Sequence, residues 1–198
     1  MIRSFLAALA TVLALTDAAS AADTLARYRG TVETRVDETL TLRRDSGERV
    51  TVTMNPKSRL LIATPGTVRD IKPESYISVI SAEENGARAV RRVALYSPSE
   101  RGFEAGDRAW DTAPDARLTA GWITDRTGRD PVEVRLRYPE GTADFAIPPG
   151  TPVTQIGPGE KALLVPGAQV VVFARTDAGG TRNADLVAVG RLGVRPAL

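Results

Sequence analysis

The stretch that decides the fold is residues 30–56, which read GTVETRVDETLTLRRDSGERVTVTMNP. Apolar and polar side chains alternate over residues 40–43 and again over residues 50–54. A period of two places every second side chain on the same face of a β-strand. The Asp-Ser-Gly sequence at residues 45–47 is typical of a turn. The stretch therefore predicts a β-hairpin with one apolar face.

The same plan is written a second time further along the chain. Residues 121–149 read GWITDRTGRDPVEVRLRYPEGTADFAIPP, and again a glycine opens a strand that leads into an alternating hairpin. Gly30 matches Gly121 and Pro73 matches Pro166, at offsets of 91 and 93 residues. Self-similarity at a fixed period is the signature of a repeated structural unit. We therefore expect two small β units of similar design.

We predict an all-β protein of two tandem small β-barrels, spanning residues 24–96 and 119–195, with five to six short strands each. Closure into a barrel hides the edges of strands that are too short to form a stable open sheet. The strand count fits the oligonucleotide/oligosaccharide-binding (OB) type of barrel, and an SH3-like barrel or a small sandwich stays open. Thr67–Ile71 predicts one helical turn, and the tail up to Leu198 is expected to fray.

Residues 97–118 connect the two predicted units and have no counterpart in either. Connections of this length tend to be functional or disordered, and large aromatic rings favour an ordered segment because they need something to pack on. In one interpretation these rings dock the connector into the seam between the barrels. In the other, the connector lines a ligand site in that seam. The residues predicted for that site are Arg101, Phe103, Asp107, Arg108, Trp110 and Asp111.

The amino terminus predicts a secretory signal peptide over residues 1–21. It has a basic residue at Arg3, an apolar run over residues 5–15 and a small-residue cleavage pattern that ends at Ala21. The apolar run is shorter than the roughly 20 residues that a membrane-spanning helix needs. We expect a periplasmic or secreted protein with no membrane span after the signal is removed.

The composition excludes several kinds of chemistry. With neither Cys nor His in the sequence, there is no thiol or imidazole nucleophile or base, no disulfide and no zinc site built on those ligands. A bound metal would have to be a hard cation held by oxygen ligands, and we predict no metal site and no cofactor. The net charge of +2 comes from 26 basic and 24 acidic residues that are interspersed, which makes nucleic acid an unlikely partner.

Two basic pairs offer a second kind of site. Arg43–Arg44 and Arg91–Arg92 lie on or beside predicted strands of the first unit. If both pairs reached one face, they would form a patch for polyanions. Charges on strand edges that block edge-to-edge pairing are the simpler interpretation.

The order of elements resembles a small exported bacterial β-barrel repeat that is catalogued as a domain of unknown function. The connector motifs SPSERG (97–102) and DRAWD (107–111), with the closing AVGR (188–191), also resemble a group of exported alphaproteobacterial proteins of about this length. Members of that group are often labelled as metal ABC-transporter components. Related chains often carry a His where this chain has Asp107, so the resemblance implies no metal site here.

From these observations we predict a non-enzymatic binding or interaction module of the periplasm, whose partner is a ligand or an envelope protein. The serines lack a histidine base, and the glycine-rich loops lack the lysine of a phosphate-binding loop. The first alternative is an accessory protein of metal-ion transport or homeostasis. The second alternative is a binder of an anionic polymer, either a glycan or a nucleic acid.

Overall fold

The structure is a computed structural model that describes residues 25–198, so the predicted signal peptide lies outside the described residues. The described chain is all-β, as predicted, and it contains no helix with the length and hydropathy needed to cross a membrane. The elements are thirteen strands and three turns of 3-10 helix: β1 (Ala26–Val36), β2 (Thr39–Arg44), β3 (Arg49–Thr53), β4 (Arg59–Gly66), η1 (Val68–Asp70), β5 (Tyr76–Glu84), β6 (Ala87–Tyr96), η2 (Pro98–Glu100), β7 (Gly106–Ala109), β8 (Arg117–Thr127), β9 (Val132–Tyr138), β10 (Gly141–Ile147), β11 (Val153–Pro158), η3 (Lys161–Leu163), β12 (Gln169–Thr176) and β13 (Arg182–Gly190).

Strands β1, β2, β3, β13 and β12 close into a five-stranded barrel, which we call the closed barrel. Antiparallel ladders join β3 to β2, β2 to β1, β1 to β12 and β12 to β13. A parallel pairing of Asn183 with Thr53 completes the ring. The interior is aliphatic, with Leu40, Leu42 and Val172 fully buried. The hairpin predicted from residues 30–56 is confirmed as β2 and β3, because alternation turns every second apolar side chain inward.

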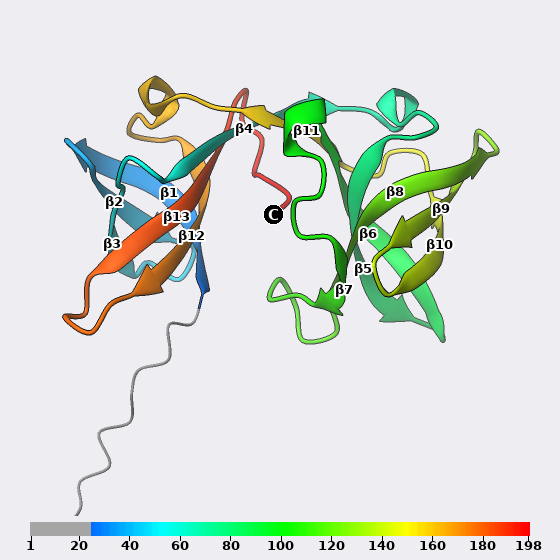
Figure 1. Cartoon of the computed structure of the whole chain (residues 1–198), viewed down its shortest axis with the longest axis horizontal. Helices are drawn as coiled ribbons and strands as arrows, with labels where there is room; N and C mark the ends of the chain where they lie inside the picture. The colour runs from blue at the N-terminus through cyan, green and yellow to red at the C-terminus, as the bar shows by residue number, and fades with distance from the viewer. Residues whose placement is uncertain (1–24) are drawn as a thin grey trace, which may run out of the picture.

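Strands β10, β9, β8, β5 and β6 form a second strand group in that order. The end strands β6 and β10 lie against each other, and the group curves around its own aliphatic core (Figure 1). Ile77, Leu136 and Ile147 are fully buried in this core. The predicted hairpin of residues 132–147 is confirmed as β9 and β10.

The strands of each predicted unit are shared between the two sides of the molecule. Strands β1–β3 pair with β12 and β13 from the far end of the chain, whereas β8–β10 are joined by β5 and β6 from before the connector. Strands β4 and β11 cross between the two sides as antiparallel neighbours. Strand β4 also runs parallel to β13, and β11 runs parallel to β6. The hydrogen-bonded sheet is therefore continuous across the molecule (Figure 1).

A third apolar cluster fills the seam between the two sides. It contains residues of both, including Tyr76 and Tyr96 from β5 and β6 and Phe173 from β12. The end of the chain belongs to this cluster, since Ala197 and Leu198 are only 2% and 1% exposed. The expectation that the tail frays is therefore wrong, because its last residues are apolar and fill the seam. The single helical turn predicted near Thr67 is confirmed as η1.

The two matched glycines occupy tight positions in β1 and β8. A Cβ atom on Gly30 would lie 2.3 Å from the carbonyl oxygen of Arg43, and one on Gly121 would lie 2.5 Å from that of Arg137. Each close approach is to the neighbouring strand, just before a β-bulge in the ladder. Bulges bend strands and increase their twist. A glycine is required at both positions because a side chain would collide with backbone that cannot move aside.

Replacing Gly30 or Gly121 with Ala should lower the free energy of unfolding by about 1–3 kcal/mol or more, because the added methyl group overpacks a backbone contact. Urea denaturation of each purified variant measures this difference. Gly157→Ala is the matched control, since a Cβ atom there would meet only ordinary contacts at 3.8 Å. Equal stability of all three variants would contradict the steric argument.

Cutting the chain within the connector tests whether the two sides of the molecule share strands from both predicted units. Fragments 25–102 and 103–198 should each fail to unfold cooperatively alone, because neither contains all the strands of the closed barrel or of the second strand group. Mixed or co-expressed, they should form a one-to-one complex with the circular dichroism spectrum of the intact chain. Two fragments that each fold as stable monomers would instead show that residues 24–96 and 119–195 are self-contained units.

Candidate functional site

The connector is ordered and holds strand β7, which pairs with β8 from Gly106 opposite Ala120 to Ala109 opposite Arg117. This short hairpin brings most of the predicted site residues against the seam. Most of them are engaged with the protein itself.

Asp107 anchors the connector to the second strand group. Its carboxylate accepts hydrogen bonds from Arg88 (2.9 Å), Arg117 (3.0 Å) and the hydroxyl of Thr119 (2.9 Å). Burial alone would raise the pKa of Asp107, but the hydrogen bonds from Arg117, Arg88 and Thr119 outweigh it and hold the pKa below its usual value. A carboxylate satisfied in this way stabilises the fold and has little capacity left for a ligand.

Trp110 and Asp111 pack against strand β1 of the closed barrel. Trp110 is only 3% exposed, and the guanidinium of Arg27 lies 3.8 Å from the centre of its ring. Asp111 accepts a hydrogen bond from Arg29 at 2.7 Å, and the same arginine also donates to the carbonyl oxygen of Leu198. Desolvation lowers the pKa of Arg27 although the charge of Asp111 opposes that shift. These contacts tie the connector and the end of the chain to β1.

Phe103 and Arg108 are also engaged within the protein. The ring of Phe103 packs between Tyr96 and Phe173, with ring centres 5.9 Å and 5.8 Å away. Arg108 forms an ion pair with Glu104 and donates to the carbonyl oxygens of Glu104 and Ala105. Their positions favour the docking interpretation of the connector.

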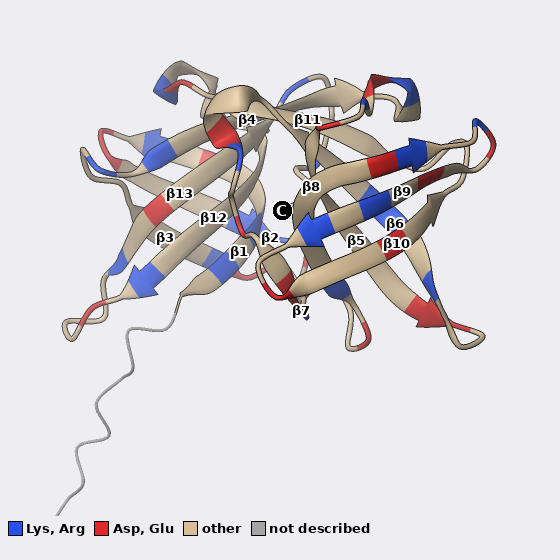
Figure 2. Ribbon diagram, turned by 45° about the vertical axis from the view of Figure 1, so that its right-hand side comes forward, with Lys and Arg blue, Asp and Glu red and all other residues tan. Residues whose placement is uncertain are grey.

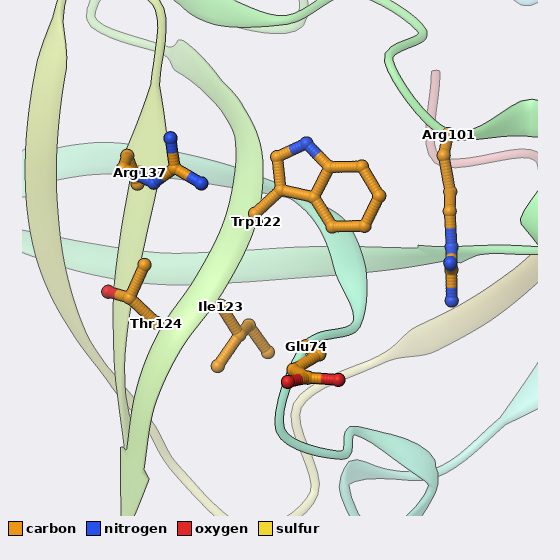
Figure 3. Close-up of a pocket in the computed structure, with 6 residues that line it drawn as sticks. All are labelled: Glu74, Arg101, Trp122, Ile123, Thr124 and Arg137. Carbon is orange, nitrogen blue, oxygen red and sulfur yellow. The ribbon is translucent and has the colours of Figure 1, made fainter.

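Arg101 is the member of the predicted set that faces an open hollow. The hollow has a volume of about 540 Å³ and is lined by Glu74, Arg101, Trp122, Ile123, Thr124 and Arg137 (Figure 3). The guanidinium of Arg101 lies 5.2 Å from the ring centre of Trp122. In this view Arg101 and Arg137 lie on opposite sides of the indole, and the Glu74 carboxylate lies below it. We call this the Trp122 hollow.

Neighbouring strands hold Trp122 in place. It lies opposite Tyr76 of β5 and Arg137 of β9 in two of the three ladders of β8. The ring of Tyr76 meets the indole edge to face, with 5.3 Å between ring centres, and its hydroxyl donates to the carbonyl oxygen of Phe103. Burial raises the pKa of Tyr76 to about 12, so this hydroxyl stays protonated and keeps its hydrogen bond. The indole is thus supported by a rigid aromatic partner.

A second hollow of about 550 Å³ adjoins the first and shares Trp122 and Arg137 with it. Tyr138 and Pro139 add apolar surface to its lining. In residues 25–198, the side chains of Arg101, Arg137 and Glu74 make no hydrogen bond or ion pair with the protein. Two unpaired guanidinium groups beside a half-buried indole suit a ligand that stacks and carries negative charge.

Sequence reasoning missed Trp122, Arg137 and Glu74. Trp122 directly follows Gly121 in a predicted strand, and Arg137 is one of the polar residues of an alternating strand. The signal available was the scarcity of tryptophan, since the chain has two. The backbone gives a further sign, because Glu74 has a φ of 62°, which is uncommon for a residue other than glycine.

The arginine pairs do not converge. Arg43 and Arg44 lie on β2 of the closed barrel, where they pair with Glu33 and Glu48. Arg91 lies on β6 of the second strand group and pairs with Glu84. This placement favours charges on strand surfaces over a shared patch.

Comparison of the chain with models of protein families, with curated proteins and with solved structures finds no significant match. Within the described residues, no group of three acidic side chains is placed to hold a metal ion. The geometry of the site itself must therefore carry any functional argument.

Replacing Asp107 with Asn should lower the free energy of unfolding by about 1–3 kcal/mol at neutral pH, because Arg88 and buried Thr119 lose a charged acceptor. The pKa of Asp107 in the folded chain lies below its unfolded value of about 4, so the carboxylate stabilises the fold above that pH. This contribution disappears as the pH falls through the lower, folded pKa. Denaturation of both proteins at a series of pH values should show the difference shrinking in acid.

Asp115→Asn is the matched control, because Asp115 is an exposed residue of the same connector and its side chain has no partner among the described residues. It should leave the stability unchanged. An equal loss for Asp107→Asn and Asp115→Asn, or a loss that does not depend on pH, would contradict the anchoring role of Asp107.

Proposed function

We propose that this chain is an exported, non-enzymatic binding module built from two OB-like barrels, and that it binds an anionic glycan at the Trp122 hollow. The observation that carries the proposal is the pair of guanidinium groups, Arg101 and Arg137, on either side of a supported indole, which make no hydrogen bond or ion pair within residues 25–198. Export is proposed on the sequence of residues 1–21 alone.

The strand order supports the OB-like assignment. We count β12 and β13 as the fourth and fifth strands of the closed barrel. The first strand then pairs with the second and the fourth, and the third pairs with the second and the fifth. This is a five-stranded Greek-key barrel, the architecture of the OB type. Strands β8, β9, β10, β5 and β6 follow the same order. The similarity of the two sets also supports a duplicated ancestral unit.

The chemistry of the Trp122 hollow favours a sugar over a nucleic acid. One face of the indole can stack on a sugar ring, the carboxylate of Glu74 can accept hydrogen bonds from hydroxyl groups, and the arginines can bind carboxylate or sulfate substituents. Single-stranded nucleic acids instead need successive aromatic platforms along a continuous basic groove.

A binding role is preferred to catalysis because, among residues 25–198, Glu74 is the one carboxylate that lines the Trp122 hollow. Glycoside hydrolysis requires two carboxyl groups that face each other across the scissile bond. The alternative of a metal-handling protein gains no support from the described residues, which hold no three-ligand group.

Oligogalacturonate should bind the intact chain, and the double variant Arg101→Ala with Arg137→Ala should bind it about tenfold more weakly or worse, because charge-assisted hydrogen bonds are lost. Isothermal titration calorimetry measures the affinity, and quenching of tryptophan fluorescence reports contact with Trp122. A neutral maltooligosaccharide should bind more weakly than the anionic probe.

The double variant Arg91→Ala with Arg92→Ala removes the same charge from β6, away from the Trp122 hollow, and should keep the affinity of the intact chain. Absence of oligogalacturonate binding would refute the proposed ligand class. Equal losses in the two double variants would refute the proposed location.

A further inference from the structure

A larger groove lies at one end of the second strand group and shares no residue with the Trp122 hollow. Its volume is about 1040 Å³, and its walls are the end of β4, the turn η1, the loop between β8 and β9 and the loop before β11. In Figure 1, η1 is the short teal coil at the upper right, above the second strand group. We call this the η1 groove.

Cations dominate the polar lining of the η1 groove. Arg69, Lys72, Arg126 and Arg129 line it, against a single carboxylate, Asp130. The whole chain carries nearly balanced charge, so this ratio is a local concentration of positive charge. Asp70 lies next to Arg69 in the chain, but its carboxylate is held by the backbone amide and the hydroxyl of Thr67 and does not line the groove.

The four cations differ in how much of their hydrogen-bonding capacity is used. Arg126 donates from Nε to the carbonyl oxygen of Ile71 at 2.9 Å, which leaves its other guanidinium nitrogens available. Lys72 donates to the carbonyl oxygen of Arg69 at 2.7 Å. Among the described residues, the side chains of Arg69 and Arg129 have no hydrogen bond or ion pair. Arg126 is therefore positioned by the protein, while Arg69 and Arg129 are uncommitted.

The turn η3 beside the closed barrel provides an internal comparison with the turn η1 and its groove. There Arg35 donates to the carbonyl oxygen of Lys161 in η3, much as Arg126 does to Ile71 beside η1. Lys161 of η3 is neutralised, because it donates to both carboxylate oxygens of Glu38, at 2.6 Å and 2.8 Å. Among residues 25–198, no carboxylate forms an ion pair with Lys72 or with the arginines of the η1 groove, although the charge of Lys72 contributes to the lowered pKa of Asp70 after the hydrogen bonds from Thr67. The charge of Lys161 beside η3 is thus balanced by a carboxylate, whereas the η1 groove carries an excess of positive charge.

We propose that the η1 groove binds a ligand that carries two or more phosphate groups. Arginine forks match the geometry of phosphate oxygens and bind them through paired hydrogen bonds. Val68, Val132 and Pro152 add apolar walls, which strengthen charge interactions by excluding water. A groove at the upper end of the usual range for ligand pockets has room for more than one phosphate. The phosphates come from a soluble oligophosphate or from the headgroups of an anionic lipid surface.

Two probes separate these sources. Sodium tripolyphosphate, titrated into the full chain by calorimetry, tests for a soluble ligand. Vesicles of phosphatidylcholine with phosphatidylglycerol, compared with pure phosphatidylcholine in a sedimentation assay, test for headgroups. Binding to tripolyphosphate assigns a soluble oligophosphate, and binding only to the anionic vesicles assigns a lipid surface. Binding to neither probe overturns the proposal.

The double variant Arg69→Ala with Arg129→Ala should weaken binding of the successful probe by about tenfold or more, because two charge-assisted contacts are lost. Both side chains lack protein partners, so the variant should keep the melting temperature of the intact chain. The control, Arg43→Ala with Arg44→Ala on β2, removes the same charge from the closed barrel and should keep the affinity. Equal losses in the two variants would show non-specific attraction and overturn the site.

A charge-preserving variant separates arginine geometry from simple attraction. Arg69→Lys with Arg129→Lys keeps the net charge but replaces both planar forks with point charges. We expect it to bind the probe less tightly than the intact chain and more tightly than the alanine variant. Affinity equal to that of the intact chain would overturn paired phosphate binding by these two arginines.

Discussion

The hydrogen-bonded pairing of strands from opposite ends of the described chain is the constraint on which the rest of the structure depends. Strand β12 completes the closed barrel by pairing with β1, where Tyr28 lies opposite Val172. Strand β5 joins the second strand group across the connector by pairing with β8. Strands β4 and β11 cross between the two sides, where β4 pairs with β13 and β11 pairs with β6. Strands β4 and β11 therefore join the two sides into one continuous sheet near the top of the molecule (Figure 2).

The local elements could be predicted because their causes lie within a few residues. Period-two alternation placed the hairpins β2–β3 and β9–β10, and the two matched glycines marked the same tight approach in β1 and β8. The partner of each strand could not be predicted in this way. Residues 76–82 of β5 and 170–174 of β12 are both buried, mainly apolar runs, so neither pattern alone selects β1 or β8 as its partner. The partner of each run depends on how β4 and β11 cross between the two sides, and no short stretch of sequence encodes that crossing.

The candidate site was only partly predictable for a related reason. The aromatic and charged residues of the connector interrupt the strand pattern and so mark it in the sequence, yet some of the groups that neutralise them come from distant strands. Asp111 meets Arg29 and Asp107 meets Arg88, and nothing near the connector in sequence announces either pair. The exposure of Trp122 could not be predicted from its position in a strand, because β8 pairs with three neighbouring strands that decide which of its side chains are covered.

The course of the chain also governs the order in which the molecule can be assembled as it is made. Strands β1–β3 emerge first, but the edges of β1 and β3 find their partners in β12 and β13, more than a hundred residues later. Pairings that distant in sequence form slowly, and they leave apolar surface uncovered in the meantime. The inward face of β1–β3, with Leu40 and Leu42, therefore stays open until nearly the whole polypeptide has been synthesised. A growing chain of this design needs protection from aggregation at its beginning until its last strands arrive.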